Sequence, residues 1–431
     1  MAEPELPPAR EVPDLHVLSA DPTSATSPRR TTSARGWGEF RRLWMAHTVS
    51  IGGDQLTLVA LPVATYAETS SAVAVGVVAS AEAVTALLFG LVAGALSDRL
   101  PRRPVLVLTD LARGVALVGL CAALLAPGSA LTALIVAALV LGVTRVLHDA
   151  AAAAAIPLVV ESPDLLAANG RLQASEATAT AVGPALAGGL MSLGGPVLAF
   201  AADAASFFVA GWALRRVRRL DHHDRIAPGR GPRSLGPQIR EGLRALLADG
   251  PMVQVVVLMA ATNVVSVSVE AQFIPYAREV LSMGSLGIGA YFALGGLAAV
   301  ATSLAAGRYQ AARGDVIEAG LAVFAAGVLV AGVLPSHLTV AVAFVGAGVG
   351  SALVMTHATA LRQRRFPVEL QGRLTMAVRT VILGILPVPL IGGGWLAGRA
   401  GPQALFVVTA SVGLGAALWG VLIGVGRLRE D

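Results

Sequence analysis

The feature that most constrains this chain is a succession of apolar stretches, each about as long as a bilayer is thick. A helix rises about 1.5 Å per residue, so about 20 apolar residues cross the hydrocarbon core. From Leu43 onward such stretches recur with short polar breaks between them. In lipid, segments of this length satisfy their backbone hydrogen bonds as helices. We therefore predict an all-α membrane protein with twelve transmembrane helices, over about residues 43–66, 72–97, 104–126, 130–158, 169–193, 196–214, 252–276, 285–306, 315–334, 337–360, 374–397 and 403–426.

Composition supports a membrane protein and argues against two other classes. The chain has 431 residues, of which 55% are hydrophobic and only 14% are charged, whereas soluble domains are about 25% charged. This balance excludes an ordinary soluble enzyme. The net charge of +5 comes from arginines that border the apolar stretches, which indicates orientation in a lipid bilayer rather than binding to nucleic acid. A single cysteine, Cys121, excludes an internal disulfide.

The arginines alternate between the breaks, and this predicts the topology. The second break contains Arg99, Arg102 and Arg103, and the longest break runs from Arg215 to Gly250 with many more, whereas the first, third and fifth breaks contain none. Because cytoplasmic loops collect Arg and Lys, we predict that both termini are cytoplasmic and that the protein is a multi-pass protein of the inner (plasma) membrane.

The longest break also predicts the domain organisation. We expect a disordered cytoplasmic tail over 1–36, a six-helix bundle over 37–219, a cytoplasmic loop over 220–249, and a second six-helix bundle with a short tail over 250–431. Within the loop, Gln238–Ala248 is amphipathic and predicts a helix on the inner membrane surface. The run Asp221–Asp224 is not predicted to bind a metal, since four adjacent side chains cannot all face one ion.

Two repeated strings indicate that the bundles are related. Gly170-Arg171-Leu172 opens the fifth apolar stretch and Gly372-Arg373-Leu374 opens the eleventh, and each leads into a cluster of Pro and Gly. Two copies of one six-helix unit predict a pseudo-symmetric pair of bundles around a central cavity.

The break Gly94–Arg103 has Gly, three residues, Asp-Arg, two residues and Arg-Arg. It resembles the loop between helices 2 and 3 of the major facilitator superfamily, although Pro101 stands where the family usually has Gly. Phe40–Trp44, Ala168–Arg171 and Arg365–Pro367 further resemble the bacterial efflux branch that contains enterobactin and macrolide exporters. The resemblance implies a secondary transporter that works by alternating access, exports small molecules, functions as a monomer and needs no cofactor.

Ionisable residues inside the apolar stretches need an explanation, because each costs about 2.5–3.5 kcal/mol on insertion scales. Asp54 and Glu82 lie near mid-depth, and a desolvated carboxylate can bind and release a proton near neutral pH. We predict that these two residues couple transport to protons. The alternative is a carboxylate that bonds permanently to a neighbouring helix.

A second group of charges lies in the cytoplasmic half. Asp110 and Arg113 are three residues apart and Arg145 and Asp149 are four apart, so each pair shares a helical face. The resemblance implies a conformational latch in the loop, and we expect the two pairs to join it. Static ion pairs are the alternative. The predicted latch residues are Gly94, Asp98, Arg99, Arg102, Arg103, Asp110, Arg113, Arg145 and Asp149.

Two further sets of residues are candidates for movement and for substrate contact. Gly183, Pro184, Gly188 and Gly189 resemble the family's antiporter motif in the fifth helix, and they predict a bending point and a close-packing face. Polar residues of the sixth and seventh stretches either line the substrate path or bond between helices: Asp203, Asn263, Glu270 and Gln272.

Taken together, these features predict proton-coupled efflux of a small amphipathic drug-like, secondary-metabolite or siderophore-type molecule. An ATP-driven pump is excluded because its phosphate-binding loop needs a lysine, and all 32 basic residues here are arginine. Uptake or lipid-type transport by the same fold, and a membrane sensor that does not transport, remain the alternatives.

Overall fold

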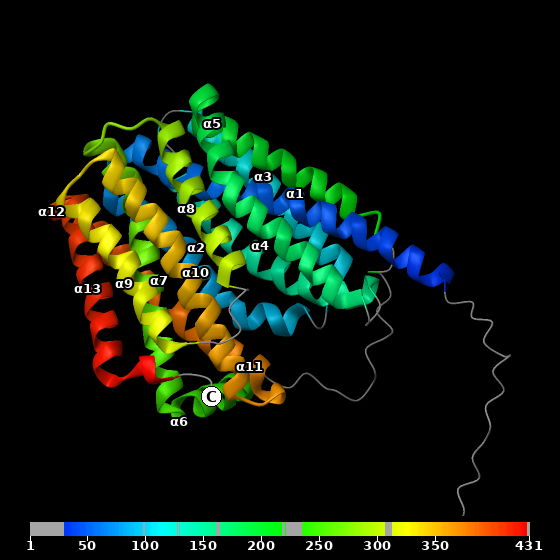
Figure 1. Ribbon diagram of the computed structural model, residues 1–431. Helices are drawn as coiled ribbons and strands as arrows, with labels where there is room; N and C mark the ends of the chain where they lie inside the picture. The colour runs from blue at the N-terminus through cyan, green and yellow to red at the C-terminus, as the bar shows by residue number, and fades with distance from the viewer. Residues whose placement is uncertain are drawn as a thin grey trace, which may run out of the picture.

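The computed structural model describes residues 30–97, 100–126, 128, 130–160, 164–217, 220, 235–306 and 313–428 (Figure 1). This part of the chain is organised in long helices joined by short turns. In order they are α1 (Arg30–Thr69), α2 (Ala72–Ser97), α3 (Arg102–Leu124), α4 (Ala130–Val159), α5 (Leu165–Leu214), α6 (Leu235–Ala248), α7 (Gly250–Glu279), α8 (Ser285–Ala306), α9 (Gly314–Val333), α10 (His337–Arg365), α11 (Val368–Ile385), α12 (Pro387–Ala400) and α13 (Pro402–Ile423). A short 3-10 turn, Val425–Arg427, follows α13.

These helices make twelve crossings, which confirms the predicted fold class. Ten helical segments of the described chain are long and apolar enough to span a membrane. One of them, Ala168–Leu214 within α5, is 47 residues long and holds two crossings, and another, Arg373–Ala400, joins α11 and α12 into one. The twelfth crossing is α1, in which the polar pair Asp54 and Gln55 lies mid-helix.

The long α5 changes direction at a pair of glycines, so its two parts run as the fifth and sixth crossings. Gly194 and Gly195 have non-helical backbone angles, and Gly195 has φ of 67° and ψ of −173°. This region of backbone conformation is open to glycine and strained for other residues. Pro196 follows directly, and proline is tolerated in the first turn of the new helix. We name the two parts α5a (165–193) and α5b (196–214).

The crossings form two bundles, α1–α5 and α7–α13, that meet at one end of the molecule and diverge toward the other (Figure 1). The end where they meet carries the α1–α2 turn at Ser70 and is called the Ser70 end. The opposite end carries α6 and the turn Val425–Arg427 and is called the α6 end.

The buried apolar residues are distributed in the same way. At the Ser70 end a single core contains residues of both bundles, such as Val63, Phe200, Phe273 and Phe406. Toward the α6 end there are two separate cores, one built around Phe40 of α1 and its neighbours in the first bundle, the other around α7, α9 and α11 of the second. The molecule is therefore joined at the Ser70 end and split at the α6 end.

Glycines allow the two bundles to approach closely at the Ser70 end. A Cβ added to Gly76 of α2 would lie 2.4 Å from the carbonyl oxygen of Leu390 in α12, and one added to Gly289 of α8 would lie 2.4 Å from that of Pro184 in α5a. Such distances are far below van der Waals contact, so these positions need glycine. Small residues at helix crossings are typical of membrane proteins, where close backbone packing holds helices together.

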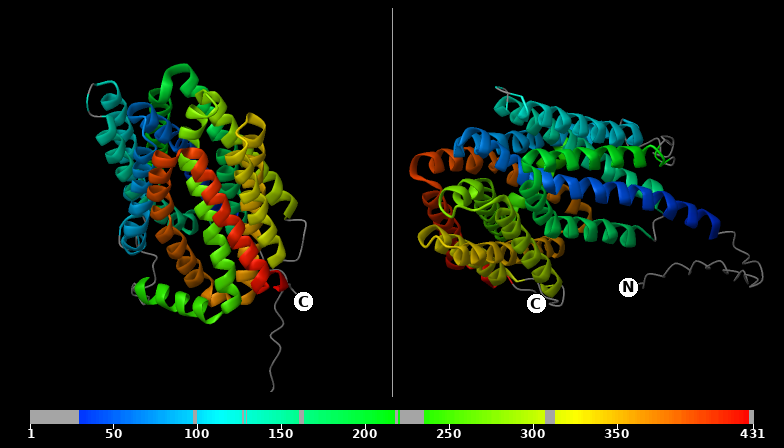
Figure 2. Two further views of the ribbon diagram at one scale, coloured as in Figure 1. Left: turned by 90° about the vertical axis from the view of Figure 1, so that its left-hand side faces the viewer. Right: turned by 90° about the horizontal axis from the view of Figure 1, so that it is seen from above.

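Helix α6 lies across the end of the second bundle (Figure 2). It covers the predicted amphipathic segment Gln238–Ala248 and begins three residues earlier, at Leu235. Leu246 is buried, and a Cβ on Gly242 would lie 2.3 Å from the carbonyl oxygen of Arg373 in α11. Glu241 forms an ion pair with the Arg373 side chain. The connection between the bundles is thus attached to α11 of the second bundle.

The N-terminal boundary differs from the expected one. Helix α1 begins at Arg30, inside the segment 1–36 that the sequence assigned to a disordered tail. The start of the first bundle is fixed by Trp37, whose indole nitrogen donates to an Asp164 oxygen at 3.0 Å and whose ring lies under the Arg171 guanidinium at 4.5 Å. Contacts with the α4–α5 connection and α5 therefore support this part of α1.

Candidate functional site

The first bundle buries a group of ionisable side chains between α1, α3, α4 and α5b. Its centre is Arg113 of α3, which is 1% exposed. Its Nη1 lies 3.8 Å from Oδ2 of Asp54 in α1, its Nε donates to the Thr144 hydroxyl of α4 at 3.4 Å, and its guanidinium lies over the Phe207 ring of α5b at 5.2 Å. One arginine thus contacts three other helices, and a cation this deep in the protein requires the neighbouring negative charge of Asp54.

Asp54 differs from Arg113 in its access to solvent. Its side chain is 20% exposed, against 2% for that of Arg113. It lies near the middle of α1, where the sequence predicted a proton-coupling carboxylate. This carboxylate is therefore partly exposed on one side and faces a buried cation on the other.

A second buried carboxylate, Asp110, lies one helical turn before Arg113 on α3. Its side chain is fully buried, and Oδ1 is 3.2 Å from Nδ1 of His148 in α4. The Thr109 hydroxyl is 3.1 Å from the same nitrogen and donates its only proton to backbone carbonyls of its own helix at 2.8 and 3.0 Å. It must therefore accept the Nδ1 proton of His148, and neither Asp110 oxygen has a hydrogen-bond partner among the described residues. The His148 ring in turn lies parallel to that of His47, at 6.3 Å between centroids.

The third buried carboxylate, Asp203 of α5b, is 0% exposed. Its Oδ2 pairs with the Thr57 hydroxyl of α1 at 2.5 Å, and its Oδ1 with the Ser206 hydroxyl at 3.1 Å. Gly53 makes room for it, because a Cβ there would lie 2.2 Å from Oδ1 of Asp203. Of the four candidates for the substrate path, Asp203 thus lies inside the first bundle, next to the predicted coupling residue Asp54.

The other predicted coupling residue, Glu82 of α2, pairs with Arg145 of α4. The distance between Nη1 and Oε1 is 3.1 Å, and the side chains are 34% and 47% exposed. The sequence assigned these two residues to different roles, Glu82 to coupling and Arg145 to the latch, and the structure brings them together. Asp149, the expected partner of Arg145 on the same helix, is exposed.

The exposure of the Glu82–Arg145 pair leads to a prediction about its strength. Exposed ion pairs contribute about 0.2–1 kcal/mol because water screens the charges and side-chain entropy is lost. We expect a double-mutant cycle with Glu82→Gln and Arg145→Gln, read by thermal unfolding in detergent, to give a coupling energy of about 1 kcal/mol or less. A coupling of several kcal/mol would mean that the pair is buried in the dominant state, as a closed latch requires.

The remaining latch residues are only partly described. Asp98 and Arg99 lie outside the described residues, and Gly94 lies near the end of α2. Arg102 is buried, and its Nη1 donates to the carbonyl oxygen of Leu100 at 3.1 Å. Arg103 donates to the carbonyl oxygen of Arg215 at the end of α5b. Because Asp98 and Arg99 are not described, the latch stays a prediction. The metal-like run Asp221–Asp224 also lies outside the described residues.

The glycine and proline residues of α5a lie at helix contacts. A Cβ on Gly183 would lie 2.3 Å from Cβ of Gln55 in α1, and one on Gly188 would lie 2.8 Å from the carbonyl oxygen of Ser285 in α8. Pro184 contributes the carbonyl oxygen that Gly289 approaches, whereas Gly189 has open space around it. This cluster packs α5a against both bundles, consistent with a close-packing face.

The polar residues of α7 make three different kinds of contact. The Asn263 amide nitrogen donates to the carbonyl oxygen of Met259 in its own helix at 2.9 Å, and Glu270, which is exposed, accepts from Ser266 at 2.7 Å. Gln272 is buried and donates to the carbonyl oxygen of Ala72 at 3.2 Å, at the start of α2. Gln272 therefore bonds across the two bundles, and Asn263 and Glu270 remain candidates for the substrate path.

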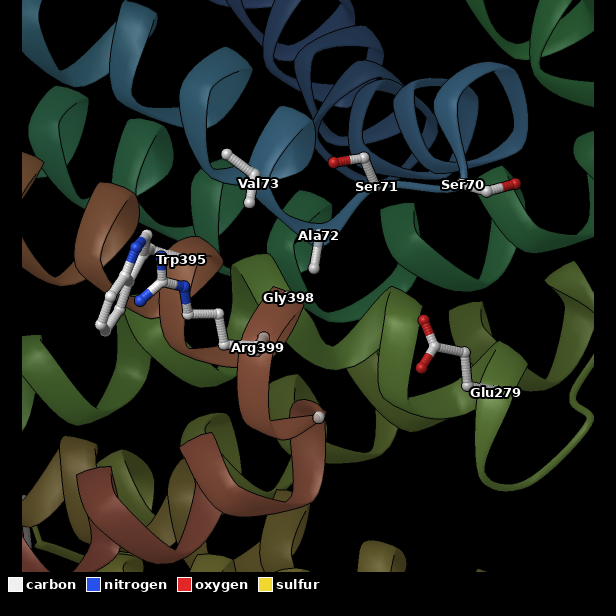
Figure 3. A pocket seen from close by; sticks show the side chains of 10 residues that line it. Ser70, Ser71, Ala72, Val73, Glu279, Trp395, Gly398 and Arg399 are labelled. Atoms are coloured by element: carbon white, nitrogen blue, oxygen red, sulfur yellow. The ribbon is translucent and has the colours of Figure 1, made fainter.

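A polar contact that the sequence does not indicate lies at the Ser70 end. The Tyr66 hydroxyl of α1 donates to the Glu279 carboxylate at the end of α7. Beside it is a cavity of about 450 Å³ whose polar lining includes Ser70, Ser71 and Arg399 (Figure 3). The Arg399 guanidinium lies over the Trp395 ring at 4.5 Å. The residues on this contact are far apart in sequence, and nothing near either one along the chain indicates its partner.

Two six-helix bundles that join at one end, with charged side chains buried between their helices, define a membrane transport protein. Residues 43–385 match the family model of the Major Facilitator Superfamily, and the chain belongs to this family.

Curated relatives and solved structures are consistent with this assignment. The enterobactin exporter EntS of Salmonella typhimurium and that of Salmonella typhi are each 27% identical over 181 residues. The alignment covers 42% of this chain and 44% of each relative, so it spans less than half of their length.

Among solved structures, a bacterial homologue of the iron transporter ferroportin in an inward-facing state has a TM-score of 0.69 at 16% identity, over 90% of this chain and 98% of that one. A bacterial homologue of the lysosomal transporter Spinster, inward-facing and occupied, has a TM-score of 0.71 at 13% identity, over 90% of this chain and 96% of that one. At these identities the likeness establishes the fold.

Proposed function

We propose that this protein exports a small amphipathic organic molecule in exchange for protons, with Asp54 as the residue where the proton enters. The observation that carries the proposal is the pair of Asp54 and Arg113, one partly exposed and the other buried, 3.8 Å apart inside a membrane-spanning bundle. Protonation of Asp54 removes the negative charge that Arg113 faces, which changes the balance of charge inside the bundle. The similarity to an enterobactin exporter supports the direction of transport and a siderophore-type or drug-like substrate.

The arrangement of the bundles supports an inward-facing state of the transport cycle. We assign the α6 end to the cytoplasm, because the arginine-rich breaks lie there. The bundles then meet on the outer side and diverge toward the cytoplasm, which is the inward-facing state, and the domains 37–219 and 250–431 move relative to each other about the Ser70 end. In this state Asp54 exchanges its proton with the cytoplasm, and export follows when the molecule opens on the other side.

The test is a transport assay in cells and in vesicles. Cells that express the protein are expected to accumulate less of a lipophilic dye such as ethidium than control cells, and a protonophore is expected to abolish the difference. Asp54→Asn mimics the protonated carboxyl, so it is expected to abolish pH-driven efflux while dye exchange without a gradient continues. Glu241→Gln, at an exposed carboxylate of α6, is the control and should transport normally.

Two results would contradict the proposal. If Asp54→Asn vesicles still concentrate dye in response to a pH gradient, the coupling residue lies elsewhere. If the wild type transports none of a panel of lipophilic cations, macrolides and catecholates in either direction, the chain does not function as an exporter of this class.

A further inference from the structure

The group of ionisable side chains around Arg113 contains more carboxylates than cations. Asp54, Asp110 and Asp203 are three carboxylates, and Arg113 is the fixed cation among them. If all four were ionised, the group would carry a net charge of −2 inside the protein. A buried ionised carboxylate without a cation is strongly disfavoured, and such groups normally take up a proton. At least one proton is therefore needed to complete this group.

Within the described part of the chain, Asp203 forms no ion pair. Arg113 is within 4 Å of Asp54, and His148 is within 4 Å of Asp110. The two side chains that bond Asp203 are the hydroxyls of Thr57 and Ser206. From α1 it faces Asp54, across Gly53, and the charges that act on it are those of Asp54 and Arg113. Its surroundings thus contribute one negative charge and one positive charge that is already paired.

The two hydroxyls suit both protonation states of Asp203. A hydroxyl group donates to an ionised carboxylate, and it accepts from a protonated one by turning its hydrogen away. Thr57 and Ser206 come from different helices and hold Oδ2 and Oδ1 separately, at 2.5 and 3.1 Å. A proton can therefore be added to either oxygen without moving the carboxyl group.

We propose that Asp203 is a second proton-binding carboxylate of this transporter, and that it holds a proton in this conformation while Asp54 is ionised beside Arg113. The proton comes from water by way of the partly exposed Asp54 and forms an O–H bond on Asp203, whose neutral carboxyl then donates to Thr57 or Ser206. Its role in coupling rests on the proposed function, whereas its protonation does not.

Infrared spectroscopy of the purified full-length protein in lipid nanodiscs tests this directly. A buried protonated carboxyl gives a C=O stretching band that an ionised carboxylate lacks. We expect the wild type to show this band at neutral pH and Asp203→Asn to lose it, while Glu241→Gln retains it. Asp54→Asn removes a neighbouring negative charge, so the pH at which the band disappears should fall by about 1 pH unit or more. If the wild-type and Asp203→Asn spectra agree at every pH in this region, Asp203 is ionised and the proposal is wrong.

A variant that keeps the carboxyl covers the case in which Asp203→Asn does not fold. Thr57→Val has nearly the same shape as the wild-type side chain but cannot hydrogen-bond to Asp203. It is expected to move the band to higher frequency, because the carboxyl loses a partner, and an unmoved band would overturn the assignment. The band is measured without substrate, so it tests the protonation of Asp203 separately from transport. A wild-type protein that shows the band but fails the dye assay would contradict the proposed export and not the protonation of Asp203.

Discussion

Replacement of Arg113 by methionine is expected to destabilise the protein by about 3 kcal/mol and to abolish proton-driven transport. Removing one partner of a buried ion pair costs about 3–5 kcal/mol because the other charge is left uncompensated. The lower end applies here, since Asp54 keeps 20% of its side-chain surface exposed and part of its charge remains solvated. The contacts of Arg113 with Thr144 and the Phe207 ring are lost as well.

Thermal unfolding in detergent measures the effect, and two further variants make it specific. Arg145→Met removes an arginine of the same bundle whose side chain is 47% exposed, so it should cost about 1 kcal/mol or less. The double variant Arg113→Met/Asp54→Asn removes both charges, so it should recover much of the stability but not the transport. Equal melting temperatures for Arg113→Met and Arg145→Met would show that Asp54 does not depend on Arg113.

The second large effect is expected at the contact between the bundles. Gly76→Val places a side chain where even a Cβ would be 2.4 Å from the Leu390 carbonyl oxygen, so α2 and α12 must separate. Overpacking of this kind costs about 1–3 kcal/mol, which corresponds to a shift of about 5- to 150-fold in a two-state equilibrium. We expect the shift to favour the state that is open at the Ser70 end and to slow transport by a similar factor.

Accessibility of an introduced cysteine measures this shift. Ser71→Cys, beside the cavity at the Ser70 end, is placed in a Cys121→Ser background, and its rate of maleimide labelling is followed in detergent. Gly392→Val is the matched control, because Gly392 lies on α12 close to Leu390 but has no atom within 4 Å of an added Cβ. Faster labelling in Gly76→Val alone is expected. Equal rates in the two variants would mean that the contact does not limit opening.

The sequence predicted the fold because membrane spans are a local property. Each crossing is a run of apolar residues, and the recurrence of such runs gives their number without knowledge of their partners. Gly194-Gly195-Pro196 also marked the boundary between the fifth and sixth crossings, where the non-helical backbone of Gly194 and Gly195 separates α5a from α5b. The Pro/Gly cluster after Leu386 similarly coincides with the break between α11 and α12.

The candidate site could be predicted only in part. Asp54, Asp110 and Arg113 stand out because charges are rare in apolar stretches, and their helical spacing shows that Asp110 and Arg113 share a face of α3. The spacing does not show that Arg113 faces Asp54, or that Arg145 faces Glu82 and not Asp149. Thr57 and Ser206, which hold Asp203, carry no charge, and hydroxyls of this kind are common in membrane helices.

What the sequence determined by itself is the number, length and predicted orientation of the helices, since these follow from hydropathy and from arginine in the breaks. The tertiary structure decided which side chains meet, because a helix presents all its faces and only packing selects a neighbour for each. Asp203 illustrates the difference. The sequence shows only that Asp203 is a polar residue in the sixth crossing. Its contact with α1 exists because Gly53 lets the two helices approach closely enough for the Asp203 carboxyl to reach Thr57.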